Sequence, residues 1–168
     1  QLLPRLYDVS KGEVLVGGEN VKDYDLETLR DQVAFVLQQN TLFTGTIREN
    51  MQWGDPDASD ETIIEALKHA AAWEFVSKYP DQLDHPVEQG GANFSGGHRQ
   101  RLTIARALLK KPQIIILDDS TSAVDMATDR QIRETFKTQL PDVTTIIIAQ
   151  RVASIEHADR ILVMHEGE

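Results

Sequence analysis

Three apolar runs in the last third of the chain predict β-strands. They cover residues 114–117, 144–149 and 160–164, and a helical pattern over about 126–139 separates the first two. Continuous apolar runs of this length are typical of parallel strands that are buried on both faces. The alternation of strand, helix and strand therefore predicts an α/β fold with a parallel sheet and right-handed crossovers.

The beginning of the chain carries weaker signals of the same kind. Residues 14–16 and 33–37 are short apolar runs that predict strands. Asp25 can cap a short helix that ends near Asp31. We therefore assign this part of the chain to the same sheet-based core as residues 112–168.

The middle of the chain has helical periodicity instead. One apolar stripe follows an N-cap at position 59 or 60, and a second ends at the stop signal of two lysines and a proline at 110–112. The stripe positions are Ile63, Ile64, Leu67, Ala70 and Ala71 in the first helix, and Leu102, Ala105, Leu108 and Leu109 in the second. We therefore predict a core of residues 1–43 and 112–168, which a helical sub-domain of residues 44–111 interrupts.

The composition excludes several classes of protein. The 168 residues are 40% hydrophobic and 26% charged, as in soluble globular domains, and the net charge is −10. That charge argues against a nucleic-acid binder, which needs a basic face, and against a polybasic membrane-surface protein. The absence of cysteine excludes a disulfide framework, a zinc ribbon and a thiol nucleophile. No apolar run approaches the roughly 18 residues of a membrane span.

Two carboxylates directly follow the apolar run of residues 114–117. Asp118 and Asp119 would lie at the carboxyl end of a buried parallel strand, which is where ligands bind in open α/β sheets. A carboxylate there can hold Mg²⁺ through water, and its neighbour can orient or deprotonate an attacking water. On these residues alone, a plain loop start remains the alternative.

A glycine turn precedes the second helical stripe. Ser95 is a good N-cap, and Gly96 and Gly97 let another molecule approach the backbone. The free N–H groups and the positive end of the helix dipole would attract an anion such as phosphate. Taken alone, the segment is explained more simply as a capped helix after a glycine turn.

Together these segments resemble the nucleotide-binding domain of ATP-binding cassette (ABC) transporters of the exporter type. Residues 94–98 (Phe-Ser-Gly-Gly-His) resemble the signature motif, residues 114–118 the Walker B strand, and residues 122–125 (Ser-Ala-Val-Asp) the D-loop. Gln38 matches the Q-loop glutamine, and Gln150, followed by an arginine, stands where the family has its switch His-Arg. The resemblance covers essentially the whole chain in the family's order.

The resemblance implies a P-loop NTPase (RecA-like) fold and a head-to-tail dimer that holds ATP and Mg²⁺ between two such domains. It implies that Asp118 and Gln38 contact the metal ion and that Asp119 and Gln150 occupy the catalytic positions. The remaining nucleotide contacts that it implies, besides Gln38, are Ser95, Gly96, Gly97, His98 and Asp125.

The resemblance also implies a place in the cell. The region from Phe43 to Met51 would help to form the groove for a coupling helix of a transmembrane domain, with ordinary helix packing as the alternative. The domain would lie at the cytoplasmic face of the cell membrane and would bind no nucleic acid. It would be the ATPase part of an exporter.

Two positions depart from the family at the same composite site. Asp119 replaces the catalytic glutamate and is one methylene shorter, and Gln150 replaces the switch histidine and cannot carry a proton. We interpret the chain as the degenerate half of a heterodimeric multidrug exporter, with a slow or inactive site of its own. His98 and Gln89 are further departures. Alternatives are unrelated drift, a binding-only regulatory module and a soluble ABC-type ATPase.

The sequence contains no Gly-x-x-x-x-Gly-Lys-[Ser/Thr] P-loop. The resemblance places this motif just upstream of Leu2, and residues 2–7 look like the last turn of a helix. We therefore expect a chain truncated at both ends, with ordinary frayed termini as the alternative. Since the P-loop supplies much of the phosphate binding, the 168 residues alone are expected to bind Mg-ATP weakly and to be inactive.

Overall fold

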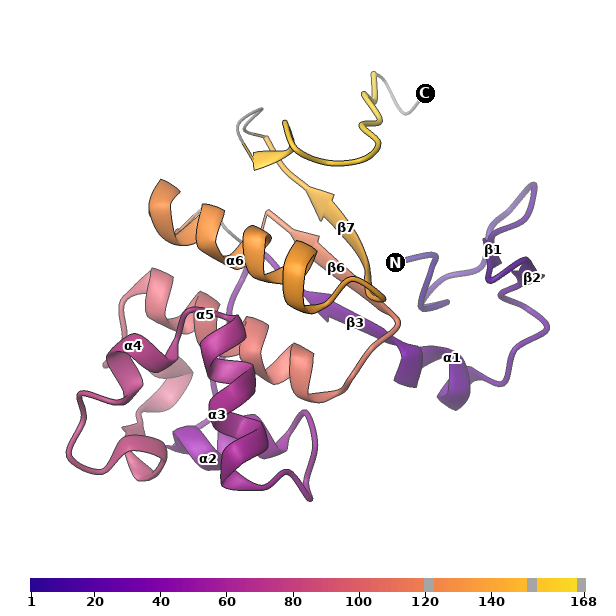
Figure 1. Cartoon of the computed structure of the whole chain (residues 1–168). Helices are drawn as coiled ribbons and strands as arrows, with labels where there is room; N and C mark the ends of the chain where they lie inside the picture. The colour runs from indigo at the N-terminus through magenta and orange to yellow at the C-terminus, as the bar shows by residue number, and fades with distance from the viewer. Residues whose placement is uncertain (120–122, 151–153, 166–168) are drawn as a thin grey trace.

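The computed structural model describes residues 1–119, 123–150 and 154–165 (Figure 1). The strands are β1 (Leu15–Val16), β2 (Glu19–Asn20), β3 (Val33–Val36), β4 (Gly45–Thr46), β5 (Pro86–Val87), β6 (Ile114–Asp118) and β7 (Thr144–Ile148). The helices are α1 (Leu26–Gln32), α2 (Ile47–Gln52), α3 (Asp60–His69), α4 (Trp73–Val76), η1 (Gln82–Asp84), η2 (Gln89–Gly91), α5 (Gly96–Leu109) and α6 (Met126–Gln139).

A parallel sheet in the order β3-β6-β7 forms the centre of the fold. Its strands pair in register, so that Val36 lies opposite Leu117 and Leu117 opposite Ile147. Side chains alternate between the two faces. Ile115 and Leu117 pack with residues of α5 and α6, whereas Ile116 packs with Leu29 of α1. Both faces of β6 are therefore covered, as its unbroken apolar run predicted.

The predicted strand at residues 160–164 is wrong. This segment is a loop, and its apolar side chains are exposed, with Leu162 at 73% and Val163 at 86%. A strand needs a hydrogen-bonded neighbour. Within the described residues, β7 is one of the two edge strands of the sheet, and no strand pairs with the loop. Residues 2–5 likewise form a turn and not a helix.

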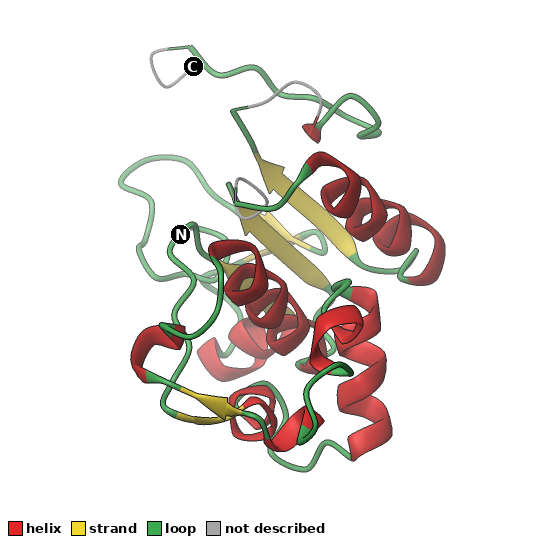
Figure 2. Cartoon of the chain, turned by 90° about the vertical axis from the view of Figure 1, so that its left-hand side faces the viewer, coloured by secondary structure: helices red, strands yellow, loops and turns green. Residues whose placement is uncertain are grey.

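Of the helices α2 to α5, α2 to α4 gather at one end of the molecule, and α5 lies between them and the sheet (Figures 1 and 2). The longest of them, α5, contacts β3, α2 and α3. The N-cap of α3 is Ser59, one of the two predicted positions, and Ile63 and Leu67 of that helix are fully buried. This end of the molecule and the sheet share one continuous apolar core.

The buried residue Asn50 ties the chain before α2 to that helix. Only 1% of Asn50 is exposed. Its Oδ1 accepts a hydrogen bond from the N–H of Phe43 at 2.8 Å, and its Nδ2 donates to the carbonyl oxygens of Phe43 (2.7 Å) and Thr46 (2.9 Å). One amide side chain thus bonds both backbone groups of Phe43 and adds a bond to the carbonyl oxygen of Thr46 at the start of α2.

We expect Asn50→Asp to lower the free energy of unfolding by about 2 kcal/mol or more. The carboxylate keeps the bond to the N–H of Phe43. It replaces the donating amide nitrogen with a buried, charged oxygen that faces the carbonyl oxygens of Phe43 and Thr46. Urea unfolding measures the loss. Asn93→Asp is the matched control, because exposed Asn93 makes the same kind of backbone bonds, and we expect it to cost less than about 1 kcal/mol. Equal losses in the two variants would refute the role assigned to Asn50.

Candidate functional site

The carboxyl ends of the three parallel strands meet at one edge of the sheet. Gln38 follows β3, Asp118 is the last residue of β6 and lies opposite Ile148, and Gln150 follows β7. The Nε2 of Gln38 donates a hydrogen bond to Oδ2 of Asp119 over 3.4 Å. The chain folds so that residues 81 positions apart are in contact at the edge where α/β proteins bind ligands.

The backbone at Asp119 leaves the strand in a sharp turn. Its φ is 44°, in the left-handed region, and its N–H donates to the carbonyl oxygen of Ile148 at 2.8 Å. Aspartate tolerates this conformation better than most residues other than glycine and asparagine. The turn directs the Asp119 side chain toward Gln38 instead of along the strand. Strained backbone of this kind is common where a side chain has a chemical task.

Asp118 and Gln38, the two residues predicted to contact a metal ion, place a carboxylate and an amide oxygen at this edge of the sheet. The described part of the chain contains no cluster of three or more His, Cys, Asp or Glu side chains suited to a metal ion. Mg²⁺ usually takes only one or two protein ligands and completes its shell with water and phosphate oxygens. Because the Nε2 of Gln38 faces Asp119, its amide oxygen remains available. The donors therefore fit Mg²⁺ that arrives with a phosphate ligand.

The glycine turn begins α5, as predicted. Ser95 is the N-cap, and its Oγ accepts a hydrogen bond from the N–H of His98 at 3.2 Å. A Cβ on Gly97 would lie 3.0 Å from the carbonyl oxygen of Ala123, whereas one on Gly96 would meet the Cβ of Ala123 at an ordinary 3.5 Å. A side chain at Gly97 would therefore crowd the close packing of α5 against the chain before α6, whereas one at Gly96 would not.

Gln100 makes a second link between α5 and the segment that precedes α6. The side chain is fully buried, and its Oε1 accepts a hydrogen bond from the N–H of Ala123 at 3.2 Å. Two residues on, Asp125 caps α6 by accepting hydrogen bonds from the N–H groups of Ala127 and Thr128. These bonds hold the pKa of the Asp125 carboxyl below its usual value. The predicted Ser122 and the arginine after Gln150 lie outside the described residues.

His98 lies against an aromatic ring from α4. Its imidazole stacks on Phe75 with centroids 3.9 Å apart and an interplanar angle of 7°, and the guanidinium of Arg101 lies 4.8 Å from the same ring centroid. Burial lowers the pKa of His98, and the charge of Arg101 lowers it further. The folded protein therefore favours the neutral imidazole.

We expect the protein to lose stability as the pH falls below about 6.5, the ordinary pKa of histidine. Below that pH the unfolded chain binds a proton that folded His98 does not yet take up, so unfolding becomes more favourable. His98→Gln should reduce the difference in urea midpoint between pH 7.5 and pH 5.5. His157→Gln, at an exposed histidine, is the control and should leave it unchanged. If His98→Gln leaves the difference in urea midpoint between the two pH values unchanged, His98 is not the cause of the loss of stability at low pH.

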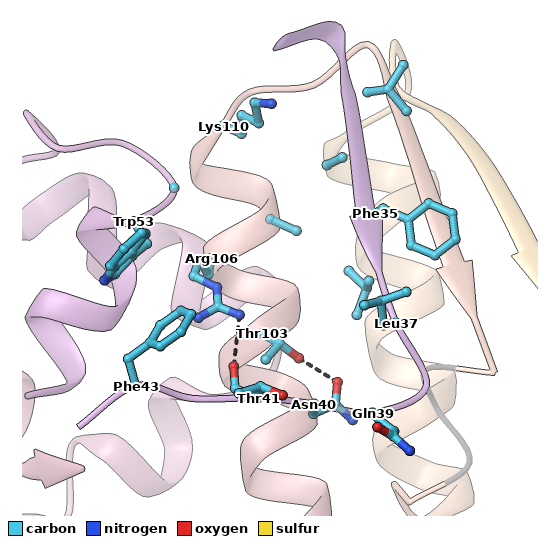
Figure 3. Close-up of a pocket in the computed structure, with 15 residues that line it drawn as sticks. Phe35, Leu37, Gln39, Asn40, Thr41, Phe43, Trp53, Thr103, Arg106 and Lys110 are labelled. Carbon is cyan, nitrogen blue, oxygen red and sulfur yellow. Dashed lines mark hydrogen bonds between the residues drawn. The ribbon is translucent and has the colours of Figure 1, made fainter. Parts of the chain in front are cut away.

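Two polar contacts between the Q-loop region and α5 were missed from the sequence. The Oγ1 of Thr103 donates to Oδ1 of Asn40 at 2.7 Å, and Nη2 of Arg106 donates to the carbonyl oxygen of Thr41 at 3.0 Å (Figure 3). The structure buries Thr103 beside the apolar stripe of α5, a position that the sequence pattern did not single out. These contacts hold the residues after Gln38 against α5.

A cavity of about 330 Å³ lies between β3, residues 39–43 and α5. At its mouth Phe43 and Trp53 stack with centroids 4.8 Å apart, and they are 44% and 70% exposed. We call these two residues the aromatic pair. Within the region predicted to form a groove, by contrast, Met51 is buried in the core, as are Ile47 and Asn50. The exposed residues of that region are Phe43, Thr44 and Glu49, and Trp53 beyond it is exposed as well.

None of the helices in the described part of the chain combines the length and the apolar character that a bilayer crossing requires.

Comparison with known proteins agrees with the predicted family and fold. The ABC transporter family matches residues 1–122. YgaD of Bacillus subtilis (strain 168), named as a candidate multidrug export ATP-binding/permease protein, is 45% identical over 166 residues, which are 99% of this chain and 29% of YgaD. SAV1866 of Staphylococcus aureus (strain Mu50 / ATCC 700699), similarly named, is 43% identical with the same coverage.

A solved structure is also similar. The structure of a bacterial Atm1-family ABC exporter with ATP bound superposes with a TM-score of 0.94 at 36% identity, over 99% of this chain and 29% of that one. The fold is thus a mixed α/β ATPase fold with a parallel sheet. The chain belongs to the ABC transporter family. It spans 29% of the length of the relatives named above.

Proposed function

We propose that this chain is the ATP-binding part of an exporter and that the site on its own sheet edge is degenerate. The observation that carries the proposal is the contact of Gln38 with Asp119 beside Asp118. Similarity to proteins named for multidrug export, and to an exporter structure with ATP bound, supports the choice of reaction.

Each residue of the sheet edge has a proposed task. Asp118 and the amide oxygen of Gln38 hold Mg²⁺, which offsets the negative charge of the phosphates when it is bound. Asp119 faces the water that attacks the γ-phosphate but is one methylene shorter than glutamate, and a misplacement of about 1 Å can cost on the order of 100-fold in rate. Gln150 can donate a hydrogen bond to the γ-phosphate but cannot take up or release a proton.

The signature turn serves a second site. The N–H groups at the start of α5, from Gly96 and Gly97, bind the phosphates of ATP held by a partner domain, and Ser95 and His98 contribute side chains. Asp125 lies at the same interface. In this proposal the partner is a different nucleotide-binding domain with an intact catalytic pair, so the dimer is a heterodimer.

The domain division and the membrane attachment complete the proposal. Residues 1–43 and 112–168 form the RecA-like core, and residues 44–111 form the helical sub-domain. The region from Phe43 to Met51, extended to Trp53, contacts the transmembrane part of the transporter at the cytoplasmic face of the cell membrane. No nucleic acid is bound, which is consistent with the charge of −10.

Transport by the full-length complex in inside-out membrane vesicles tests this function. Addition of ATP should drive the accumulation of at least one member of a panel of hydrophobic cationic dyes, and a non-hydrolysable ATP analogue should not. Asp118→Asn and the matched Asp142→Asn, at an exposed turn, separate metal binding from a general loss of charge. A complex that hydrolyses ATP but moves no dye, even with lipid-like substrates added to the panel, would contradict the export function.

A further inference from the structure

The segment that carries Gln38 has little backbone support. The ladder between β3 and β6 ends at Val36. Beyond it, residues 38–42 form no backbone–backbone hydrogen bond with any other described residue. Gln38 and Gln39 are exposed, and the next buried side chain is that of Leu42. The position of Gln38 therefore depends on contacts that side chains make.

One such contact joins the segment to α5. The Oγ1 of Thr103 donates to Oδ1 of Asn40 at 2.7 Å (Figure 3). The Nδ2 of Asn40 then donates to the carbonyl oxygen of Gln38 at 3.4 Å, and the side chain of Gln38 donates to Oδ2 of Asp119 at the same distance. A path of three hydrogen bonds thus runs from Thr103 in α5 to Asp119 after β6.

The hydroxyl of Thr103 has a second acceptor within reach. Its Oγ1 lies 2.8 Å from the carbonyl oxygen of Gln100 in the same helix. A hydroxyl has one proton to donate, so the two acceptors compete for it. Thr103 is buried, and a hydroxyl without an acceptor would be unfavourable there. Because Gln100 offers an acceptor, the bond to Asn40 can break without leaving the hydroxyl unsatisfied.

The other contact between this segment and α5 lies further from Gln38. Nη2 of Arg106 donates to the carbonyl oxygen of Thr41 at 3.0 Å, which leaves the backbone of residue 38 untouched. Asn40, by contrast, bonds to the carbonyl oxygen of Gln38 itself. Among the described contacts, the one between Asn40 and Thr103 therefore acts most directly on Gln38.

We propose that Asn40 and Thr103 are positioning residues, which form a reversible latch that holds Gln38 beside Asp119. With the latch closed, the Gln38 side chain keeps its bond to Asp119, and its amide oxygen is held ready for Mg²⁺. With the latch open, the hydroxyl of Thr103 turns to Gln100 and the segment around Gln38 is released. This inference rests on the proposed function, which gives Gln38 its task.

Spin-label mobility in the full-length complex tests the latch itself. A nitroxide is attached at Gln39→Cys, an exposed position, after cysteines elsewhere in the complex have been replaced. Thr103→Val removes the hydroxyl and keeps the branched shape, so the ratio of mobile to immobile label should rise about fivefold, the effect of one hydrogen bond. Electron paramagnetic resonance measures the ratio without nucleotide, so that no metal ion holds Gln38.

Two variants are matched controls for Thr103→Val. Thr103→Ser keeps the hydroxyl and should keep the native ratio. Thr138→Val removes a hydroxyl that also donates to a carbonyl oxygen of its own helix, but at an exposed position of α6, and should change nothing. An unchanged ratio in Thr103→Val, or an equal rise in Thr103→Val and Thr103→Ser, would overturn the latch.

Asn40→Ala opens the latch from its other side and covers a Thr103 variant that fails to fold. It should raise the ratio at least as much as Thr103→Val. The double variant should be no more mobile than Asn40→Ala alone, because both changes break the same bond. A rise that adds up in the double variant would overturn the pairing of Asn40 with Thr103.

Binding of Mn²⁺ in place of Mg²⁺ tests the positioning of Gln38. Mn²⁺ is titrated in the presence of ATP, in a complex whose partner site has lost its own metal-binding carboxylate. Thr103→Val should weaken Mn²⁺ binding by about fivefold, whereas Thr103→Ser and Thr138→Val should leave it unchanged. A label that becomes mobile in Thr103→Val while Mn²⁺ binding stays native would overturn the positioning role.

Gln38→Ala separates this inference from the proposed function. Weaker Mn²⁺ binding in Gln38→Ala, with native binding in Thr103→Val, would reject the latch and leave the proposed metal site intact. Native Mn²⁺ binding in both variants would reject Gln38 as a metal ligand, and the latch would lose its task with it.

Discussion

Asp119→Glu combined with Gln150→His should raise ATP hydrolysis at the site of this chain by about 100-fold in the full-length complex. The longer side chain brings the carboxylate nearer to the attacking water, and the histidine restores a group that can carry a proton. The measurement is single-turnover hydrolysis of ATP held at this site, while the partner's site is blocked by substitution of its own catalytic glutamate.

The backbone at position 119 adds a second expectation for the same variant. Because Asp119 has a φ of 44°, and glutamate tolerates the left-handed region less well than aspartate, the gain in rate should come with a loss of about 1 kcal/mol in stability. Asp142→Glu is the matched control, since it adds one methylene at an exposed turn and should change neither quantity. Unchanged hydrolysis in the double variant would show that the two substitutions do not explain a slow site.

Gly97→Ala should lower hydrolysis at the partner's site by about 100-fold. The new Cβ would lie 3.0 Å from the carbonyl oxygen of Ala123, so the first turn of α5 must shift by a few tenths of an ångström. The N–H groups that we propose to bind the phosphates then lose their alignment. Hydrolysis is measured in the complex that carries an unmodified partner.

The matched variant for Gly97→Ala is Gly96→Ala, whose Cβ makes an ordinary 3.5 Å contact. Alanine is also the better helix former, so Gly96→Ala should keep or slightly raise the melting temperature, whereas Gly97→Ala should lower it. If both variants melt alike and partner-site hydrolysis is unaffected by Gly97→Ala, the close packing of Gly97 has no functional role.

The elements predicted most accurately are those whose signal is local. Residues 126–139 form α6 as predicted, because a helix of that length carries its periodicity and its cap, Asp125, within its own sequence. The strand β6 could be predicted because burial on both faces leaves an unbroken apolar run. Residues 160–164 also contain an apolar run, but a strand depends on a neighbour that no local pattern reveals.

The residues of the candidate site likewise fall into those that a local sequence signal locates and those that it does not. The carboxylates at the end of β6 could be located from the strand alone, and parallel pairing then brings Gln38 beside Asp119. Gln100 and Arg106 were not predicted as links, because each binds a backbone group from a distant part of the chain. A polar residue inside an apolar stripe signals that a partner exists but does not say which residue it is.

The most direct test of a degenerate site on this chain is to identify the nucleotides that the native full-length complex retains after one turnover. Photo-cross-linkable ATP is bound, the reaction is quenched after one turnover, and the label at each site is identified as a triphosphate or a diphosphate. We expect a triphosphate at the site next to Asp118 and a diphosphate at the site completed by Ser95 and Gly97. Cleavage at both sites at equal rates would contradict a degenerate site on this chain.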